Sequence, residues 1–236
     1  MDAITAMVPM LVRSVATRGR LIAVGVLGAI GVVIAIAIRQ AQPDVENLAS
    51  VLILQFGLVL LVPVVSLVVA SATLGNLVEN RTLVYLWLRP VAVWKTAVAA
   101  IVSGLIIVVP LVVVPLAVIG AVLGDGSDIL GAAVAAGLGA VGYVSVFTAL
   151  GLMTQRALAF GLVYILVWEG FIAGLSRSAA RFALRTHTSS ALAQLADAPD
   201  LLTDPYRVVT VVIVIIGVLL TGLAVTSWRL GAMEID

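Results

Sequence analysis

The chain has 236 residues, of which 63% are hydrophobic and only 11% are charged. A soluble domain needs polar cover and carries ~25% charged residues, so this composition excludes an ordinary soluble protein and favours an all-α integral membrane protein. The net charge of +1 indicates no nucleic-acid partner, and the absence of cysteine together with a single histidine predicts no metal site.

The first segment, 2–12, is short and apolar and contains Pro9, and it is followed by Arg13, Arg18 and Arg20. This pattern favours a helix lying in the membrane interface, although a frayed terminus fits equally well. The apolar run 21–38 is longer than the ~7–15 residues of a signal-peptide core. We therefore expect it to be retained as the first span.

Six runs have the length that crosses a bilayer, at roughly 20 apolar residues each. They form a single transmembrane domain, 1–236, with spans at 21–38, 50–74, 98–123, 129–153, 157–175 and 208–228. Pro63 lies in span two, and Pro110 and Pro115 lie in span three, where we expect kinks.

Basic residues predict the orientation of the spans. Three arginines precede span one and only Arg39 follows it. This bias places both termini in the cytoplasm of a multi-pass protein of the cell membrane.

The connection 75–97 carries the signals of a short amphipathic helix at the cytoplasmic surface. Asn76 is predicted to cap it, with Glu79 three residues later. An apolar face follows at helical spacing and a proline ends it. Those residues are Leu83, Leu86, Trp87 and Pro90. Such a helix can dock on a soluble partner, and a generic amphipathic connector is the alternative.

At this connection the chain resembles the ABC-2 type transporter permeases. In that family, span two is followed by an acidic residue, a Thr-Leu pair, a hydrophobic helix, a proline and a basic residue that opens span three. The matching residues here are Glu79, Thr82, Leu83, Leu86, Pro90 and Lys95. The chain departs from the pattern at Asn80, where a charged residue is common, and at Arg81, where glycine is usual. The order of hydropathy extends the resemblance over nearly the whole chain.

The resemblance implies a permease subunit of an ATP-driven exporter of a hydrophobic or amphipathic molecule, such as a drug or lipid. Its partners would be two copies of a cytoplasmic ATP-binding subunit, a second copy of this permease or a homologous one, and membrane lipids. ATP and Mg would bind the partner subunit, because this chain has no P-loop motif, holds no cofactor and is not expected to be an enzyme. The implied coupling residues are Glu79, Arg81, Thr82, Leu83, Leu86 and Arg89.

Glu169 is the only acidic residue inside a predicted span. A charge at mid-bilayer costs ~3 kcal/mol, so Glu169 is predicted to face helix neighbours or a transport route, with a structural hydrogen bond or a snorkel to the surface as alternatives. Gly170 and Gly174 permit tight helix contact. The resemblance implies that span five, including Tyr164, borders the dimer axis and the route, and the run 168–170 looks like a subgroup of actinobacterial permeases.

The connection 176–207 contains Arg177, Arg181 and Arg185, whose spacing predicts one cationic helix face. Phe182, Leu192 and Leu195 suggest partial membrane contact. In the family that this chain resembles, short outer-loop helices dip back into the membrane here. A cationic face would attract lipid phosphates or acidic substrate groups, and the alternative is a solvated charged helix.

Two other functions remain open on the sequence. One is a stand-alone secondary transporter or channel, which usually needs several ionisable residues within its spans. The other is a membrane scaffold without transport activity. An adjacent ATPase gene, or an ATPase that copurifies, would distinguish the ATP-driven exporter from both.

Overall fold

The computed structural model describes residues 3–41, 48–79, 92–196, 198, 201–202 and 204–232, without the side chains of 76–79 and 177. Six helical stretches in these ranges are long and apolar enough to cross a membrane, which confirms the predicted number of spans. The helices are α1 (Ala3–Val15), α2 (Arg18–Ala41), α3 (Leu48–Leu52), η1 (Ile53–Leu61), α4 (Val62–Glu79), α6 (Val93–Leu123), α7 (Gly126–Met153), α8 (Ala157–Val163), η2 (Tyr164–Ile172), α9 (Ala173–Leu175), α10 (Arg177–Ala180), α11 (Leu184–Leu195) and α12 (Val208–Ala232).

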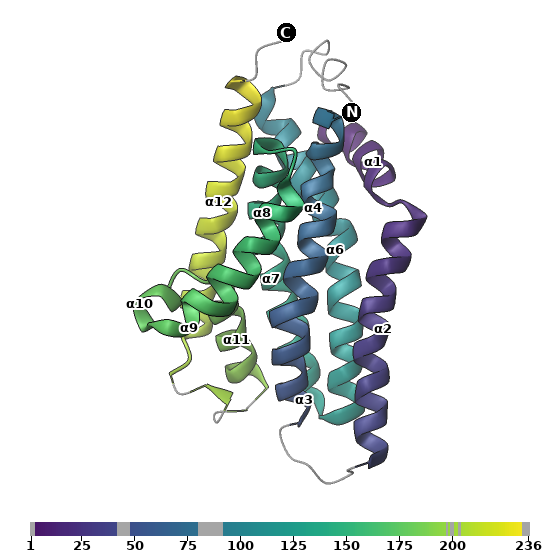
Figure 1. Ribbon diagram of the computed structural model, residues 1–236, viewed down its shortest axis with the longest axis vertical. Helices are drawn as coiled ribbons and strands as arrows, with labels where there is room; N and C mark the ends of the chain where they lie inside the picture. Colours follow the sequence, from purple (N-terminus) through teal and green to yellow (C-terminus); the bar gives the residue numbers. More distant parts are fainter. Residues whose placement is uncertain are drawn as a thin grey trace.

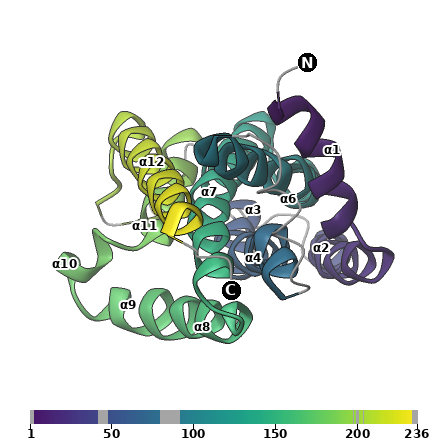
Figure 2. The same ribbon diagram turned by 90° about the horizontal axis from the view of Figure 1, so that it is seen from above.

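Span four, α7, is the centre of the bundle and packs against α4, α6, α11 and α12 (Figures 1 and 2). Small residues on its buried positions allow these neighbours to approach closely, because helices in lipid associate through backbone proximity and van der Waals contact. They include Gly131, Ala135, Gly139, Ala140 and Gly142.

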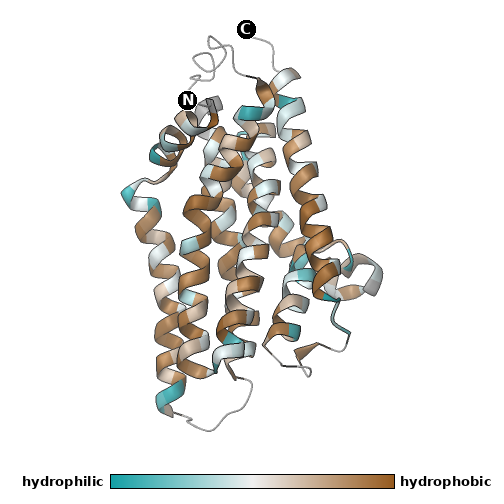
Figure 3. Cartoon of the chain, turned by 180° about the vertical axis from the view of Figure 1, so that it is seen from behind, coloured by the Kyte–Doolittle hydropathy of each residue, from teal (hydrophilic) through white to brown (hydrophobic). Residues whose placement is uncertain are grey.

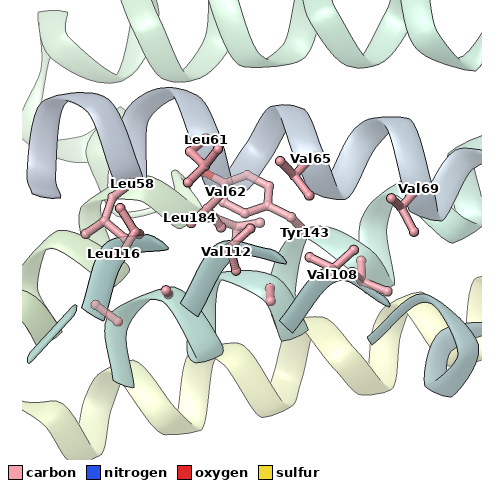
Figure 4. Close-up of a cluster of buried hydrophobic side chains, with 14 of the residues drawn as sticks. Leu58, Leu61, Val62, Val65, Val69, Val108, Val112, Leu116, Tyr143 and Leu184 are labelled. Carbon is pink, nitrogen blue, oxygen red and sulfur yellow. The ribbon is translucent and has the colours of Figure 1, made fainter. Parts of the chain in front are cut away.

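The core lies where span two, α6 and α7 meet. Leu61 and Val65 from span two, Val112 from α6 and Tyr143 from α7 are fully buried there (Figure 4). The outer surface of the spans is apolar as well, with the hydrophilic residues gathered mainly toward the helix ends (Figure 3). An apolar surface all around a bundle is stable only in hydrocarbon, which supports a multi-pass membrane protein.

All three prolines at which kinks were predicted lie inside helical structure. Pro63 follows the π-helical segment η1, where the Val62 N–H donates to the Gly57 carbonyl five residues back. Helix α6 runs as one element through Pro110 and Pro115. A Cβ atom at Gly28 would lie only 3.1 Å from Pro115 Cγ, so glycine lets α2 lie against this proline.

The N-terminal segment is an ordered helix and not a frayed end. Helix α1 packs against α4 and α6 through Met7, Leu11 and Val15, which recur every four residues and are buried. Ser103 Oγ on α6 also donates to the Val8 carbonyl at 3.3 Å. Helix α1 is inclined to α2 at one end of the bundle, which is also the end where α12 finishes (Figure 1).

Polar groups join spans two and four at the opposite end. Asp125 caps α7, because its side chain accepts hydrogen bonds from the backbone N–H groups of Ser127 and Asp128. The Ser127 hydroxyl donates to the same carboxylate. This hydroxyl bond, followed by the two backbone bonds, holds the pKa of Asp125 below its ordinary value. Ser50 Oγ donates to Asp128 Oδ1 at 2.6 Å. The start of span two is therefore fixed beside the start of span four.

Candidate functional site

The predicted coupling residues lie at or beyond the end of the described part of span two. Glu79 is the last residue of α4, and its side chain is not described. Arg81, Thr82, Leu83, Leu86 and Arg89 lie outside the described residues. Asn76 lies inside α4, so the prediction that it caps a separate helix is wrong. The helical backbone of span two continues past the apolar run instead of ending with it.

Glu169 lies inside the protein, where it accepts hydrogen bonds from three elements. Its side chain is 2% exposed. Its carboxylate accepts a bond from the Tyr143 hydroxyl of α7, one from the Tyr164 hydroxyl at 3.0 Å, and one from the Leu184 backbone N–H at 3.0 Å. We predicted that Glu169 faces helix neighbours or the route and not lipid. Its contacts with helix neighbours confirm the first of these alternatives.

The π-helical geometry of η2 explains how Tyr164 and Glu169 meet within one span. Residues five apart point ~140° away from each other in an α-helix of 3.6 residues per turn. The wider π-turn closes at i to i+5 and brings such residues to one side. Tyr164 and Glu169 have this spacing and both lie in η2. The local widening of span five therefore builds half of the site.

Glu169 also caps α11. The N-cap residue of this helix is Ala183, which has no side-chain acceptor, and the Glu169 carboxylate takes the N–H of Leu184 in its place. A carboxylate at a helix N-terminus is further favoured by the helix dipole. Glu169 thus connects span five to α11. This contact is the structural hydrogen bond that the sequence analysis named as one alternative for Glu169.

An aromatic cluster encloses this carboxylate on the α7 side. Phe147 stacks on Tyr143 with ring centroids 5.8 Å apart, and it meets Tyr164 edge-on at 6.1 Å. Tyr143 and Phe147 are fully buried. Aromatic rings pack favourably in both geometries, so the tyrosines are held with their hydroxyls at Glu169.

The three arginines of the connection do not share one helix face, so that prediction is wrong. Arg177 lies in α10, Arg181 follows its end, and Arg185 lies in the first turn of α11. The helix breaks because Ala183 is extended, at φ −91° and ψ 126°, which turns the Leu184 N–H toward Glu169. Arg181 is exposed, and Arg185 is half-buried.

The other predicted contacts of this region divide between the lipid side and the bundle. Phe182 is 77% exposed, consistent with contact to membrane or solvent, whereas Leu192 is completely buried in the core.

Gly170 and Gly174 of span five are exposed. A Cβ atom at Gly174 would meet nothing within 4 Å, and one at Gly170 would meet only the Ile165 carbonyl of the same span. Among the described residues, no atom of another helix would lie within 4 Å of a Cβ atom at either glycine, so the pair does not make the tight contact that its spacing permits.

Sequence reasoning missed the contacts that fix α11 to the start of α12. Gln194 Nε2 donates to the Tyr206 carbonyl at 2.6 Å, and Gln194 Oε1 accepts from the Val208 N–H at 3.2 Å. His187 stacks on the Tyr206 ring with centroids 5.1 Å apart. The polar composition of 185–194 is the signal in the sequence, because a polar segment between two apolar spans must find partners where it packs inside.

The described residues contain no cluster of three or more histidine, aspartate or glutamate side chains that could hold a metal ion. Comparisons with protein-family models, curated proteins and solved structures find no match to this chain.

Proposed function

We propose that the chain is the transmembrane permease subunit of an ATP-binding cassette exporter of the ABC-2 type, located in the plasma membrane. The observation that carries the proposal is the position of the connection whose residues resemble that family. Helix α4 ends at Glu79 and α6 begins at Val93 at the same end of the bundle as α1 and the last turn of α12 (Figure 1). Span two therefore ends, and span three begins, at the end of the bundle that also carries Arg13 of α1 and Arg18 and Arg20 in the first turn of α2.

The energy source follows from what the sequence contains. The sequence has no P-loop, and the proposal therefore assigns ATP to a cytoplasmic subunit, two copies of which would bind a pair of permeases. Glu169 is the one acidic residue of the described spans that is buried at mid-helix, and its oxygens already accept hydrogen bonds from three donors. This engagement favours ATP-driven transport over ion-driven transport, and the family resemblance implies a hydrophobic or amphipathic cargo.

The proposal predicts that both termini are cytoplasmic. Reporter fusions placed after Asp44, Asp125 and Asp197 are expected to report the outside, since the predicted topology puts the connections that contain these residues on the side opposite the termini. A fusion at Asp236 is the matched inside control. A cytoplasmic signal at any of the three positions would contradict the orientation.

The coupling assignment predicts that Glu79→Arg and Arg81→Glu, made separately, will dissociate the ATP-binding subunit or lower cargo-stimulated ATP hydrolysis about tenfold. Each change reverses a charge available for charge-assisted hydrogen bonds with a partner, worth roughly 1.5–3 kcal/mol. The measurement is copurification of the ATPase together with hydrolysis in reconstituted vesicles. Arg207→Glu, a reversal at the opposite end of the bundle, is the control and should leave both unchanged. Normal binding and stimulation in both variants would refute the assignment.

A further inference from the structure

An open groove runs along the outer surface between α2 and α6, the first and third spans. It has a volume of about 430 Å³ and is lined entirely by apolar residues and glycine, among them Gly25, Ala29, Val33, Val114 and Val118. Val33 is 64% exposed and Val114 is 58% exposed. These residues lie within two spanning helices, at least five residues from either end, so hydrocarbon surrounds the groove.

Glycine and proline shape this groove. Gly28 brings α2 against Pro115 and forms its floor, because a Cβ atom there would lie 3.1 Å from the proline ring. Gly25, one turn earlier, lies over open space, since a Cβ atom there would meet nothing within 4 Å. Open space at Gly25 therefore adjoins the close contact at Gly28, and a longer side chain at position 25 would fill it.

The length and lining of the groove suit an extended apolar occupant. From Gly25 to Val33 the groove extends over eight residues, or ~12 Å at 1.5 Å per residue. A hydrocarbon chain that lies along the spans would contact apolar residues of both helices over this length. A helix of a second copy is the alternative occupant, and the disulfide measurement below tests it.

A cation lies beyond one end of the groove, on the same two helices. Arg39 lies six residues beyond Val33 on α2, or ~9 Å along the axis, and its Nη1 donates to the Val122 carbonyl at the end of α6, 3.0 Å away. This bond fixes the guanidinium beside the two helices that form the groove. The carbonyl is uncharged, so the positive charge remains available to an anion at the depth of the lipid headgroups.

We propose that this groove binds one acyl chain of an anionic phospholipid whose headgroup phosphate pairs with Arg39. The apolar lining accepts the hydrocarbon chain, and the guanidinium distinguishes an anionic lipid from one without net charge. The site is separate from the Glu169 cluster and from the coupling connection. The proposal therefore stands whether or not the chain works with an ATPase.

The test uses the full chain in phosphatidylcholine vesicles that contain a trace of phosphatidylglycerol with a photoreactive diazirine on its acyl chain. Phosphatidylcholine with the same label is the uncharged comparison. Mass spectrometry of the cross-linked peptides is expected to place the label on Val33 and Val114 in preference to the exposed face of α12. Arg39→Gln should lower labelling by the anionic probe about fivefold, to the level of the uncharged probe.

Gly25→Leu should lower labelling by both probes at least fivefold, because the new side chain fills the groove. Arg207→Gln and Gly217→Leu are the matched controls, since Arg207 is exposed and a Cβ atom at Gly217 meets nothing within 4 Å. Both controls should label normally. Equal labelling of the groove and of α12, or unchanged labelling of Arg39→Gln, would overturn the proposal. So would a disulfide between copies carrying Val33→Cys, which the cysteine-free chain allows to be measured directly.

Discussion

Replacement of Glu169 by leucine is expected to destabilise the folded chain by about 3 kcal/mol. Leucine has a similar volume but accepts no hydrogen bond, so the hydroxyls of Tyr143 and Tyr164 and the N–H of Leu184 lose their acceptor. In a chain of this size, that loss lowers the midpoint of thermal unfolding by ~6–12 °C. Unfolding of the purified protein in detergent measures it.

Two variants separate the hydrogen bonds from the change in shape. Glu169→Gln keeps one acceptor oxygen and should lose about 1 kcal/mol, while Tyr164→Phe removes a single donor and should lose a similar amount. Leucine is thus expected to cost more than either. If the leucine variant unfolds at the wild-type temperature, the carboxylate does not stabilise the fold.

The same change is expected to release α11 from span five. Ser190 on α11 is only 1% exposed, and a Ser190→Cys substitution gives a unique thiol in a chain without cysteine. Labelling of this thiol by a membrane-impermeant maleimide should accelerate roughly tenfold when Glu169 is leucine, as expected for a loss of ~1.4 kcal/mol in local stability. An unchanged rate would mean that packing against α7 alone holds α11 in place.

The spans were predictable because each apolar run has the length of a helix that crosses a bilayer. The residues at which the helices begin and end were not predictable. Span three was expected from residue 98 and its helix begins at Val93, so Trp94 and Lys95 lie within the helix and not before it. Span one was expected from residue 21 and begins at Arg18. Hydropathy marks where the hydrocarbon ends, whereas the helical backbone continues until its hydrogen bonds are met elsewhere.

The Glu169 cluster was predictable only as a buried acid in need of partners. Its partners come from 26 residues earlier, at Tyr143, and from 15 residues later, at Leu184. Neither separation follows a helical period. The i to i+5 contact with Tyr164 requires a π-turn, which apolar periodicity does not reveal. The prediction that Arg177, Arg181 and Arg185 share a helix face failed for the same reason. Their spacing fits one continuous helix, but the helix is interrupted where the Leu184 N–H bonds to Glu169.

Gly151→Ala is expected to destabilise the packing of α4 against α7 by about 3 kcal/mol. A Cβ atom at Gly151 would lie 2.3 Å from the Ser71 carbonyl oxygen, a separation that no folded protein tolerates, and the nearby atoms belong to backbone that cannot rotate away. Close approach of backbones is also the main attraction between helices in lipid, so moving them apart weakens every contact around this point. Thermal unfolding in detergent and the monodisperse fraction on size exclusion measure the effect.

Gly137→Ala is the matched control for this prediction, because it places the same methyl group on the same helix. A Cβ atom at Gly137 would meet nothing within 4 Å, so alanine there adds helix propensity without a clash and should stabilise the chain by about 0.5–1 kcal/mol. The two variants should therefore shift the unfolding midpoint in opposite directions. Equal shifts would show that α4 and α7 do not pack backbone to backbone at Gly151, and the central position of α7 in the bundle would lose its physical basis.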